Sequence, residues 1–161
     1  MSEARFMQRL AGLIPDAAGY REPSGRAATD ELFRAHVASE LEALRAKMAE
    51  LKGAAEEEGE EDMLDDLDRI DMRMERTIEA LGSAGQAAAF FSGAVDDAHL
   101  SRVCSYDLAI LEDVALLVRD TMGLKYETIG NLTLREVEGT LAAIELKINN
   151  RKDVLADTGR S

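Results

Sequence analysis

The sequence predicts an all-α protein: an antiparallel helical bundle of about four long helices, with a coiled-coil-like hairpin and a short N-terminal amphipathic helix. Both prolines, Pro15 and Pro23, lie near the start, so no later residue forbids a helix. The hydrophobic content of 46% comes mostly from aliphatic residues, because aromatic residues account for only 4%. Apolar residues also recur at alternating four- and three-residue steps, which places them along one side of a helix. Two such seams stand out: Val37, Leu41, Leu44, Met48 and Leu51, and then Met63, Leu67, Ile70 and Met74.

The first element is expected to be a short amphipathic helix over residues 3–14, ended by Pro15. Its apolar side carries four residues, with Arg5 and Arg9 beside them: Phe6, Leu10, Leu13 and Ile14. These four are candidates for docking on a protein partner or on a membrane, and packing on the chain's own bundle is the alternative. Residues 16–25 then form an irregular connector, which is expected to anchor through Tyr20.

A helical hairpin is expected over residues 29–81. Its first helix, capped by Ser24 or Thr29, is expected to end near Gly53. Residues 50–68 contain two glycines and ten acidic residues against a single lysine, so we expect the chain to turn there. A continuous helical rod is the alternative, since glutamate-rich runs tolerate helix.

The second helix of the hairpin is expected to begin near Met63 and to end near Gly82 or Gly85. An apolar run at residues 87–91 follows it and is expected to extend a helix or to plug one end of the bundle. The chain is therefore divided into residues 1–25, with the short helix and connector, and a single bundle domain over residues 26–161.

Two further long helices are expected over residues 97–156. Asp96 or Asp97 can cap the first of them, which runs to about Met122. The second is expected to start at Thr133, because Thr133 to Glu136 match the capping-box pattern. Its apolar seam continues at three- and four-residue steps, with one charged residue, Arg151, at a seam position.

Charge and cysteine content limit the possible partners and compartment. The net charge of −13 argues against nucleic acid, because phosphate contacts need clustered basic residues. Residues 1–26 carry a net +1, which leaves −14 for the rest, so only the front end favours an anionic surface. The single cysteine, Cys104, excludes an intramolecular disulfide, and the sequence shows no apolar run long enough to span a membrane. A cytoplasmic location is therefore expected.

Few residues in the sequence are candidates for catalysis or metal binding. The two histidines, His36 and His99, fall outside any H-E-x-x-H or E-x-x-H pairing, so surface or capping roles are expected. Cys104 lies among apolar residues, where a core thiol with a raised pKa is expected. Several aspartates cluster without the order of an EF-hand, which favours a solvated acidic face: Asp62, Asp65, Asp66, Asp68 and Asp71. The sequence thus predicts no catalytic residue, no metal site and no cofactor.

Several short motifs resemble a known family. They are Leu13-Ile14-Pro15-Asp16-Ala17-Ala18-Gly19-Tyr20, Thr29-Asp30-Glu31-Leu32-Phe33-Arg34-Ala35-His36, Phe90-Phe91, Tyr106-Asp107-Leu108 and Leu111-Glu112. This pattern resembles uncharacterised bacterial and archaeal helical proteins that open with L-I-P-G-Y-x-G-Y, although Asp16 and Ala17 stand where that family has its first Gly-Tyr. The resemblance implies a helical fold and a contextual link to membrane-scaffold proteins of the SPFH type. The family has no assigned activity, so the resemblance implies no catalytic residue.

The sequence therefore predicts a non-enzymatic helical interaction or scaffold protein that acts through coiled-coil-like surfaces. A protein partner or self-association is expected, because two long seams can exceed what one chain covers. One alternative is a peripheral membrane protein that docks through residues 3–14. Another is a helical bundle that binds a metal through carboxylates.

Overall fold

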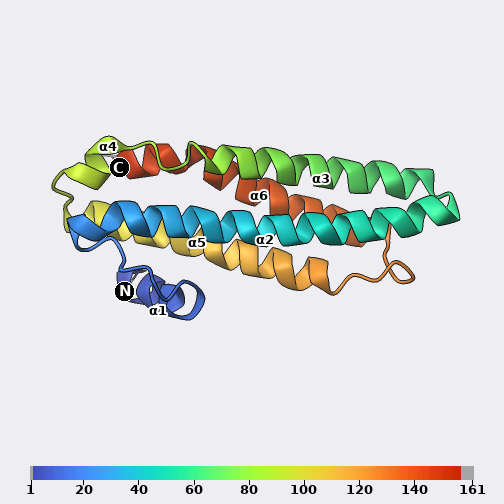
Figure 1. Ribbon diagram of the computed structural model, residues 1–161, viewed down its shortest axis with the longest axis horizontal. Helices are drawn as coiled ribbons and strands as arrows, with labels where there is room; N and C mark the ends of the chain where they lie inside the picture. Colours follow the sequence, from blue (N-terminus) through green and yellow to red (C-terminus); the bar gives the residue numbers. More distant parts are fainter. Residues whose placement is uncertain (1, 157–161) are drawn as a thin grey trace.

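The computed structural model describes residues 2–156, and these residues form α-helices and no β-strand (Figure 1). The prediction of an all-α protein is confirmed. Six helices follow one another in the described residues: α1 (Ser2–Leu13), α2 (Pro23–Glu58), α3 (Glu61–Leu81), α4 (Ala88–Ser92), α5 (Asp97–Met122) and α6 (Asn131–Ala156).

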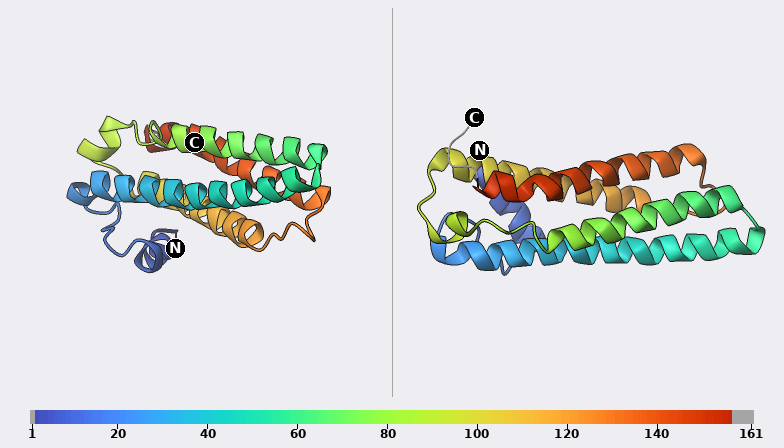
Figure 2. Two further views of the ribbon diagram at one scale, coloured as in Figure 1. Left: turned by 45° about the vertical axis from the view of Figure 1, so that its right-hand side comes forward. Right: turned by 90° about the horizontal axis from the view of Figure 1, so that it is seen from above.

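The four long helices lie side by side along the length of the molecule (Figures 1 and 2). Helix α2 contacts α3 and α5, and α6 contacts the same two helices, so the contacts form a closed ring. The short helix α4 packs against α2 and α6. Helix α1 packs against α5, on the outside of the long helices (Figure 1).

The expected hairpin is formed by α2 and α3, and the turn between them is set by Gly59. Gly59 has a φ of +69°, which a residue without a Cβ adopts readily. Its N–H donates to the Glu56 carbonyl, and the Glu60 N–H donates to the Ala55 carbonyl, the two bonds of a Schellman motif. The turn lies inside the predicted acidic segment, and the alternative of one continuous rod is wrong.

The predicted end of the first hairpin helix at Gly53 is also wrong, because α2 continues to Glu58. A glycine inside a helix costs only about 1 kcal/mol relative to alanine. Leu51 and Ala55, one on each side of Gly53, are buried, so tertiary packing offsets that cost.

Of three predicted helix caps, two differ from the structure and one agrees. Helix α2 begins at Pro23, and proline is tolerated in the first turn of a helix. Neither Ser24 nor Thr29 caps it: Ser24 lies inside the helix, and the Thr29 hydroxyl instead bonds both the N–H and the carbonyl of Gly19. Helix α6 begins at Asn131, two residues before the predicted cap at Thr133. The cap at Asp96 is confirmed, since its carboxylate accepts from the His99 N–H at 2.7 Å.

Both apolar seams of the hairpin are covered by the chain itself. From Val37 to Leu51 no seam residue is more than 2% exposed, and Leu67, Ile70 and Met74 are fully buried. Met63, at the start of the second seam, is half-buried and packs against the core. The chain's own helices therefore cover most of both seams.

Candidate functional site

A buried arginine, Arg151 on α6, organises one end of the molecule. Its guanidinium donates to both carboxylate oxygens of Asp107, at 2.8 and 2.9 Å, and to Asp30 at 2.6 Å. It also donates to the Ala84 carbonyl and to the Tyr20 hydroxyl, each at 3.0 Å. These five bonds match the five N–H donors of a guanidinium. We call Tyr20, Asp30, Asp107 and Arg151 the Arg151 cluster.

The two aspartates of the Arg151 cluster are balanced by Arg151 together with Arg34, which lies beside the cluster on α2. Asp30 also forms an ion pair with Arg34, whose Nε lies 2.9 Å from Oδ2 of Asp30. Two arginines therefore pair with two aspartates. Burial alone would lower the pKa of Arg151, but Asp107, Tyr20 and Asp30 hold it well above its ordinary value. Burial, aided by Asp107, raises the pKa of Tyr20 far above its ordinary value, so its hydroxyl stays protonated and donates to Asp107 at 2.7 Å. Since every donor has a partner, the geometry supports a structural role.

The same end of the molecule contains a second buried arginine, Arg26. It is 3% exposed and donates to the backbone carbonyls of Tyr20 at 2.7 Å and Gly93 at 3.0 Å. Together, the two arginines join the connector before α2, the segment between α3 and α5, and three of the long helices. We call this the arginine end, and we call residues 55–66 around the α2–α3 turn the acidic end.

Three of the four docking candidates in and just after α1 lie in the core. Phe6 and Leu10 are fully buried and Ile14 is 7% exposed, whereas Leu13 is 40% exposed. The Phe6 ring also stacks on Tyr20, with ring centroids 5.3 Å apart. Docking through Phe6, Leu10 and Ile14 would therefore require α1 to leave α5, and only Leu13 is available where it lies.

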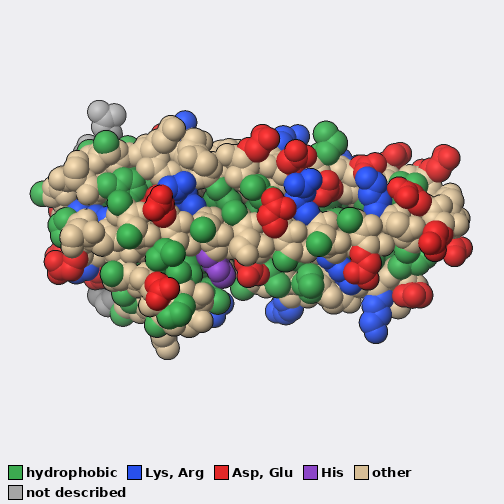
Figure 3. Space-filling model, in the orientation of Figure 1, with side chains coloured by type: hydrophobic (Ala, Val, Ile, Leu, Met, Phe, Trp, Pro, Cys, Tyr) green, Lys and Arg blue, Asp and Glu red, His purple; other side chains and the backbone are tan. Residues whose placement is uncertain are grey.

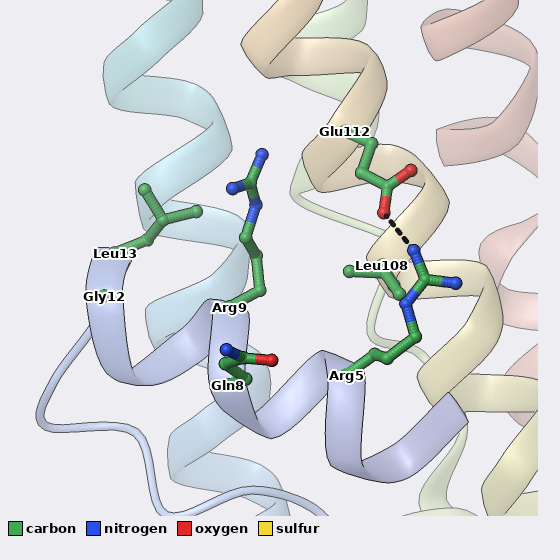
Figure 4. A pocket seen from close by; sticks show the side chains of 7 residues that line it. All are labelled: Arg5, Gln8, Arg9, Gly12, Leu13, Leu108 and Glu112. Carbon is green, nitrogen blue, oxygen red and sulfur yellow. Dashed lines mark ion pairs between the residues drawn. The ribbon is translucent and has the colours of Figure 1, made fainter. Parts of the chain in front are cut away.

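A pocket of about 620 Å³ opens between α1 and α5 (Figure 4). Arg5, Gln8 and Arg9 project from α1 on one side, and Glu112 faces them from α5. Arg5 forms an ion pair with Glu112 at 3.6 Å. The pocket is lined by Arg5, Gln8, Arg9, Gly12, Leu13, Leu108 and Glu112.

A groove of about 700 Å³ runs between the first half of α2 and the end of α3. Figure 3 shows apolar side chains between these helices in the left half of the view, whereas acidic side chains crowd the right-hand end. The groove is lined by Ala28, Glu31, Leu32, Arg34, Ala35, Ala38, Ile78, Leu81 and Gly82. Its lining is mostly apolar and open to solvent.

The histidines and the cysteine have structural surroundings. His99 was expected at the surface or in a cap; its backbone does receive the cap, but its ring is buried and its Nε2 lies 2.9 Å from the Val154 carbonyl oxygen. His36 is half-buried on α2. Cys104 is a core residue, as predicted, and burial together with Glu3 and Asp107 raises its pKa to about 12.

Several of the clustered aspartates pair with basic side chains. Asp66 pairs with Arg69, and Asp68 pairs with Lys52. Asp71 receives the guanidinium of Arg45. Among residues 2–156 no three His, Cys, Asp or Glu side chains gather where they would share a metal ion.

Comparisons with family models, with curated proteins and with solved structures found no match to this chain. The resemblance to the L-I-P-G-Y-x-G-Y family therefore stays a prediction. In the described part of the chain, no helix has the length and apolar character needed to cross a bilayer.

Sequence reasoning found Arg151 at a seam position but missed its partners. Asp107 lies 44 positions away and Asp30 lies 121 positions away, so no local pattern links them. One signal was present: Asp30 and Asp107 themselves occupy seam positions, between Arg26 and Phe33 and between Cys104 and Leu111. Charges of opposite sign on the seams of three helices indicate a buried ion cluster.

Proposed function

We propose that this protein is a non-enzymatic helical interaction protein, and that the α2–α3 groove receives an amphipathic helix from a partner protein. The observation that carries the proposal is the groove itself. Its apolar residues Leu32 and Ile78 are half-buried, so the chain's own helices leave them partly open to solvent. In the proposal, the four long helices act as an antiparallel bundle, and its coiled-coil-like hairpin presents the groove as a rigid surface.

The groove has the dimensions and lining that suit a helix. Ala28, Ala35 and Ala38 lie along α2 over roughly 15 Å, or three helical turns. Their small side chains allow another helix to approach closely, since the distance between packed helices depends on the side chains at the contact. Burial of a partner's apolar face on Leu32 and Ile78 supplies about 25 cal/mol per Å².

Charge favours a basic partner helix. The chain has a net charge of −13, and Glu31 stands at the groove. Arg34 also lines the groove, but it is bound to Asp30 and to the Leu81 carbonyl. A helix with lysine or arginine beside its apolar face is therefore attracted by the surface as a whole.

A binding experiment with a designed peptide tests this proposal. The probe is a fluorescent Leu/Lys amphipathic helix of about 18 residues, or five turns, and the control peptide has the same composition in scrambled order. Ala35 is exposed, so Ala35→Arg places a cation in the groove without touching the core. Ala143→Arg makes the same change at an exposed site on α6 and serves as the matched control.

We expect fluorescence anisotropy to show that Ala35→Arg weakens binding by about tenfold or more, equivalent to 1.4 kcal/mol, and that Ala143→Arg has little effect. Equal binding of the scrambled peptide, or equal effects of the two variants, would contradict the proposal. A concentration-dependent dimer that Ala35→Arg dissociates in sedimentation equilibrium would also contradict it, because a second copy would then occupy the groove.

A further inference from the structure

The pocket between α1 and α5 is a second site, separate from the α2–α3 groove. Arg5 and Arg9 stand one turn apart on α1 and project toward the same side, facing Leu108 and Glu112 of α5 (Figure 4). With a volume of about 620 Å³, the pocket lies within the range of small-ligand sites.

The cations of the pocket are available to a ligand. Arg9 makes no hydrogen bond or ion pair with any residue in the described part of the chain. The only such contact of Arg5 there is its ion pair with Glu112, at 3.6 Å with both side chains well exposed to water, and such pairs are weak. Two arginines and one glutamate leave a local charge of +1, which matches an anion of single charge.

The pocket also has apolar walls and free volume. Leu13 is 40% exposed, and Leu108 lies between the two arginines in the view of Figure 4. A Cβ added at Gly12 would meet nothing within 4 Å, so the space beside that turn of α1 is empty. A ligand that fills the pocket therefore has an apolar part next to its anionic group.

We propose that this pocket binds a monoanionic carboxylate with an aliphatic body. The planar fork of an arginine matches a carboxylate and can bind it through two parallel N–H donors. Polyanions are disfavoured, because the net charge of −13 repels them while Arg5 and Arg9 compensate only locally. A free acid and the C-terminal residue of a peptide present the same chemistry.

Titration of the full chain with octanoate, followed by ¹H–¹⁵N NMR, tests the proposal. We expect shifts at α1 and α5 that saturate with octanoate and are absent with octanamide, its neutral counterpart. Arg9→Gln should weaken binding about tenfold or more. Gly12→Leu fills the empty space and should abolish binding, while circular dichroism shows that the helix content is kept. Arg119→Gln removes an exposed arginine of α5 outside the pocket and should leave binding unchanged.

Other outcomes would overturn the inference. Equal binding of octanamide would show that the carboxylate is not recognised, and equal binding of inorganic phosphate would show that the apolar walls play no part. An equal loss from Arg119→Gln and Arg9→Gln would reduce the effect to overall charge. N-acetyl-leucine, compared with octanoate, distinguishes the two sources: tighter binding assigns the pocket to a peptide C-terminus, and weaker binding assigns it to a free acid. Either result supports the carboxylate site.

Discussion

At the arginine end, two buried guanidinium groups join segments far apart in the chain, whereas at the acidic end a two-residue turn connects neighbouring helices. Arg151 binds groups from residues 20 to 107, and the residues it touches come from four other segments. At the acidic end, the buried residue is apolar, Ala55, with Leu51 and Leu67 buried on either side, and most of the acidic side chains are exposed to water.

The two ends also differ in what a lost side chain leaves behind. Removal of Arg151 leaves the buried Asp107 carboxylate without an ion-pair partner, whereas Asp30 keeps its pair with Arg34. An unpaired buried charge is costly. Removal of a glutamate at the acidic end leaves no buried group unpaired, because that side chain is exposed to water in the folded chain as well as in the unfolded one. Net charge alone therefore does not locate the residues whose loss costs most. We expect removal of one buried charge at the arginine end to cost more stability than removal of a solvated charge at the acidic end.

A charge placed in the apolar seam should lower the stability of the fold more than any other change, because the seam runs between the two ends and supports both. Leu44 is fully buried, and Leu44→Asp places a carboxylate there with no partner. We expect the cooperative thermal transition to disappear, as measured by circular dichroism; Ile70→Asp should do the same. Ala43→Asp, at the adjacent exposed position, should leave the transition nearly unchanged. A cooperative transition in Leu44→Asp would show that the seam is not the common support.

Arg151→Met should have the next largest effect and should act on the arginine end. We expect the free energy of unfolding, measured by urea denaturation, to fall by about 3–5 kcal/mol. Arg45→Met removes a half-buried arginine that pairs with Asp71 and should cost much less, about 1 kcal/mol or under.

The source of the Arg151 effect can be separated by adding Asp107→Asn to Arg151→Met, because Asp107 loses its ion-pair partner whereas Asp30 keeps Arg34. If uncompensated charge causes the loss, neutralising Asp107 should restore part of the stability. If the double variant is no more stable than Arg151→Met, the cause is lost packing around the guanidinium, whose carbon lies 4.7 Å from the centre of the Phe33 ring.

Two glycines should respond to alanine with opposite signs. A Cβ at Gly85 would lie 2.4 Å from Oδ2 of Asp30 and 2.9 Å from Nε of Arg34, so Gly85→Ala must displace a bound ion pair. We expect a loss of about 1–3 kcal/mol in the free energy of unfolding. Gly53 lies inside α2 with nothing within 4 Å of an added Cβ, and Gly53→Ala should gain about 1 kcal/mol. Equal changes in the free energy of unfolding for the two variants would show that Gly85 is not packed tightly against Asp30 and Arg34.

The sequence was sufficient to predict the helices, because the three- and four-residue periodicity is local. The hairpin helices and the burial of Leu44 and Ile70 follow from that spacing, and the turn follows from the glycines and the acidic run between the two seams. The exact ends were harder: Gly53 resembles a helix stop, but burial of Leu51 and Ala55 carries α2 past it.

The partners of each seam could not be predicted in the same way. An amphipathic pattern shows that one face of α1 is buried, but it does not show that α5 covers it or that Phe6 meets Tyr20. The Arg151 cluster and the two surface sites depend on residues brought together by the whole fold. Pocket and groove shape are tertiary properties, which one helix's sequence does not encode by itself.

The smallest effect is expected at the acidic end, where Glu56, Glu57 and Glu58 are all exposed. Their replacement by glutamine keeps helix propensity nearly constant and removes three charges from a solvated surface. We expect the free energy of unfolding to change by less than about 0.5 kcal/mol in urea denaturation at physiological salt. A modest increase at low salt would reflect relief of repulsion among neighbouring acids. A loss of more than 1 kcal/mol would mean that these glutamates stabilise the α2–α3 turn, and the two ends would then share a dependence on specific charges.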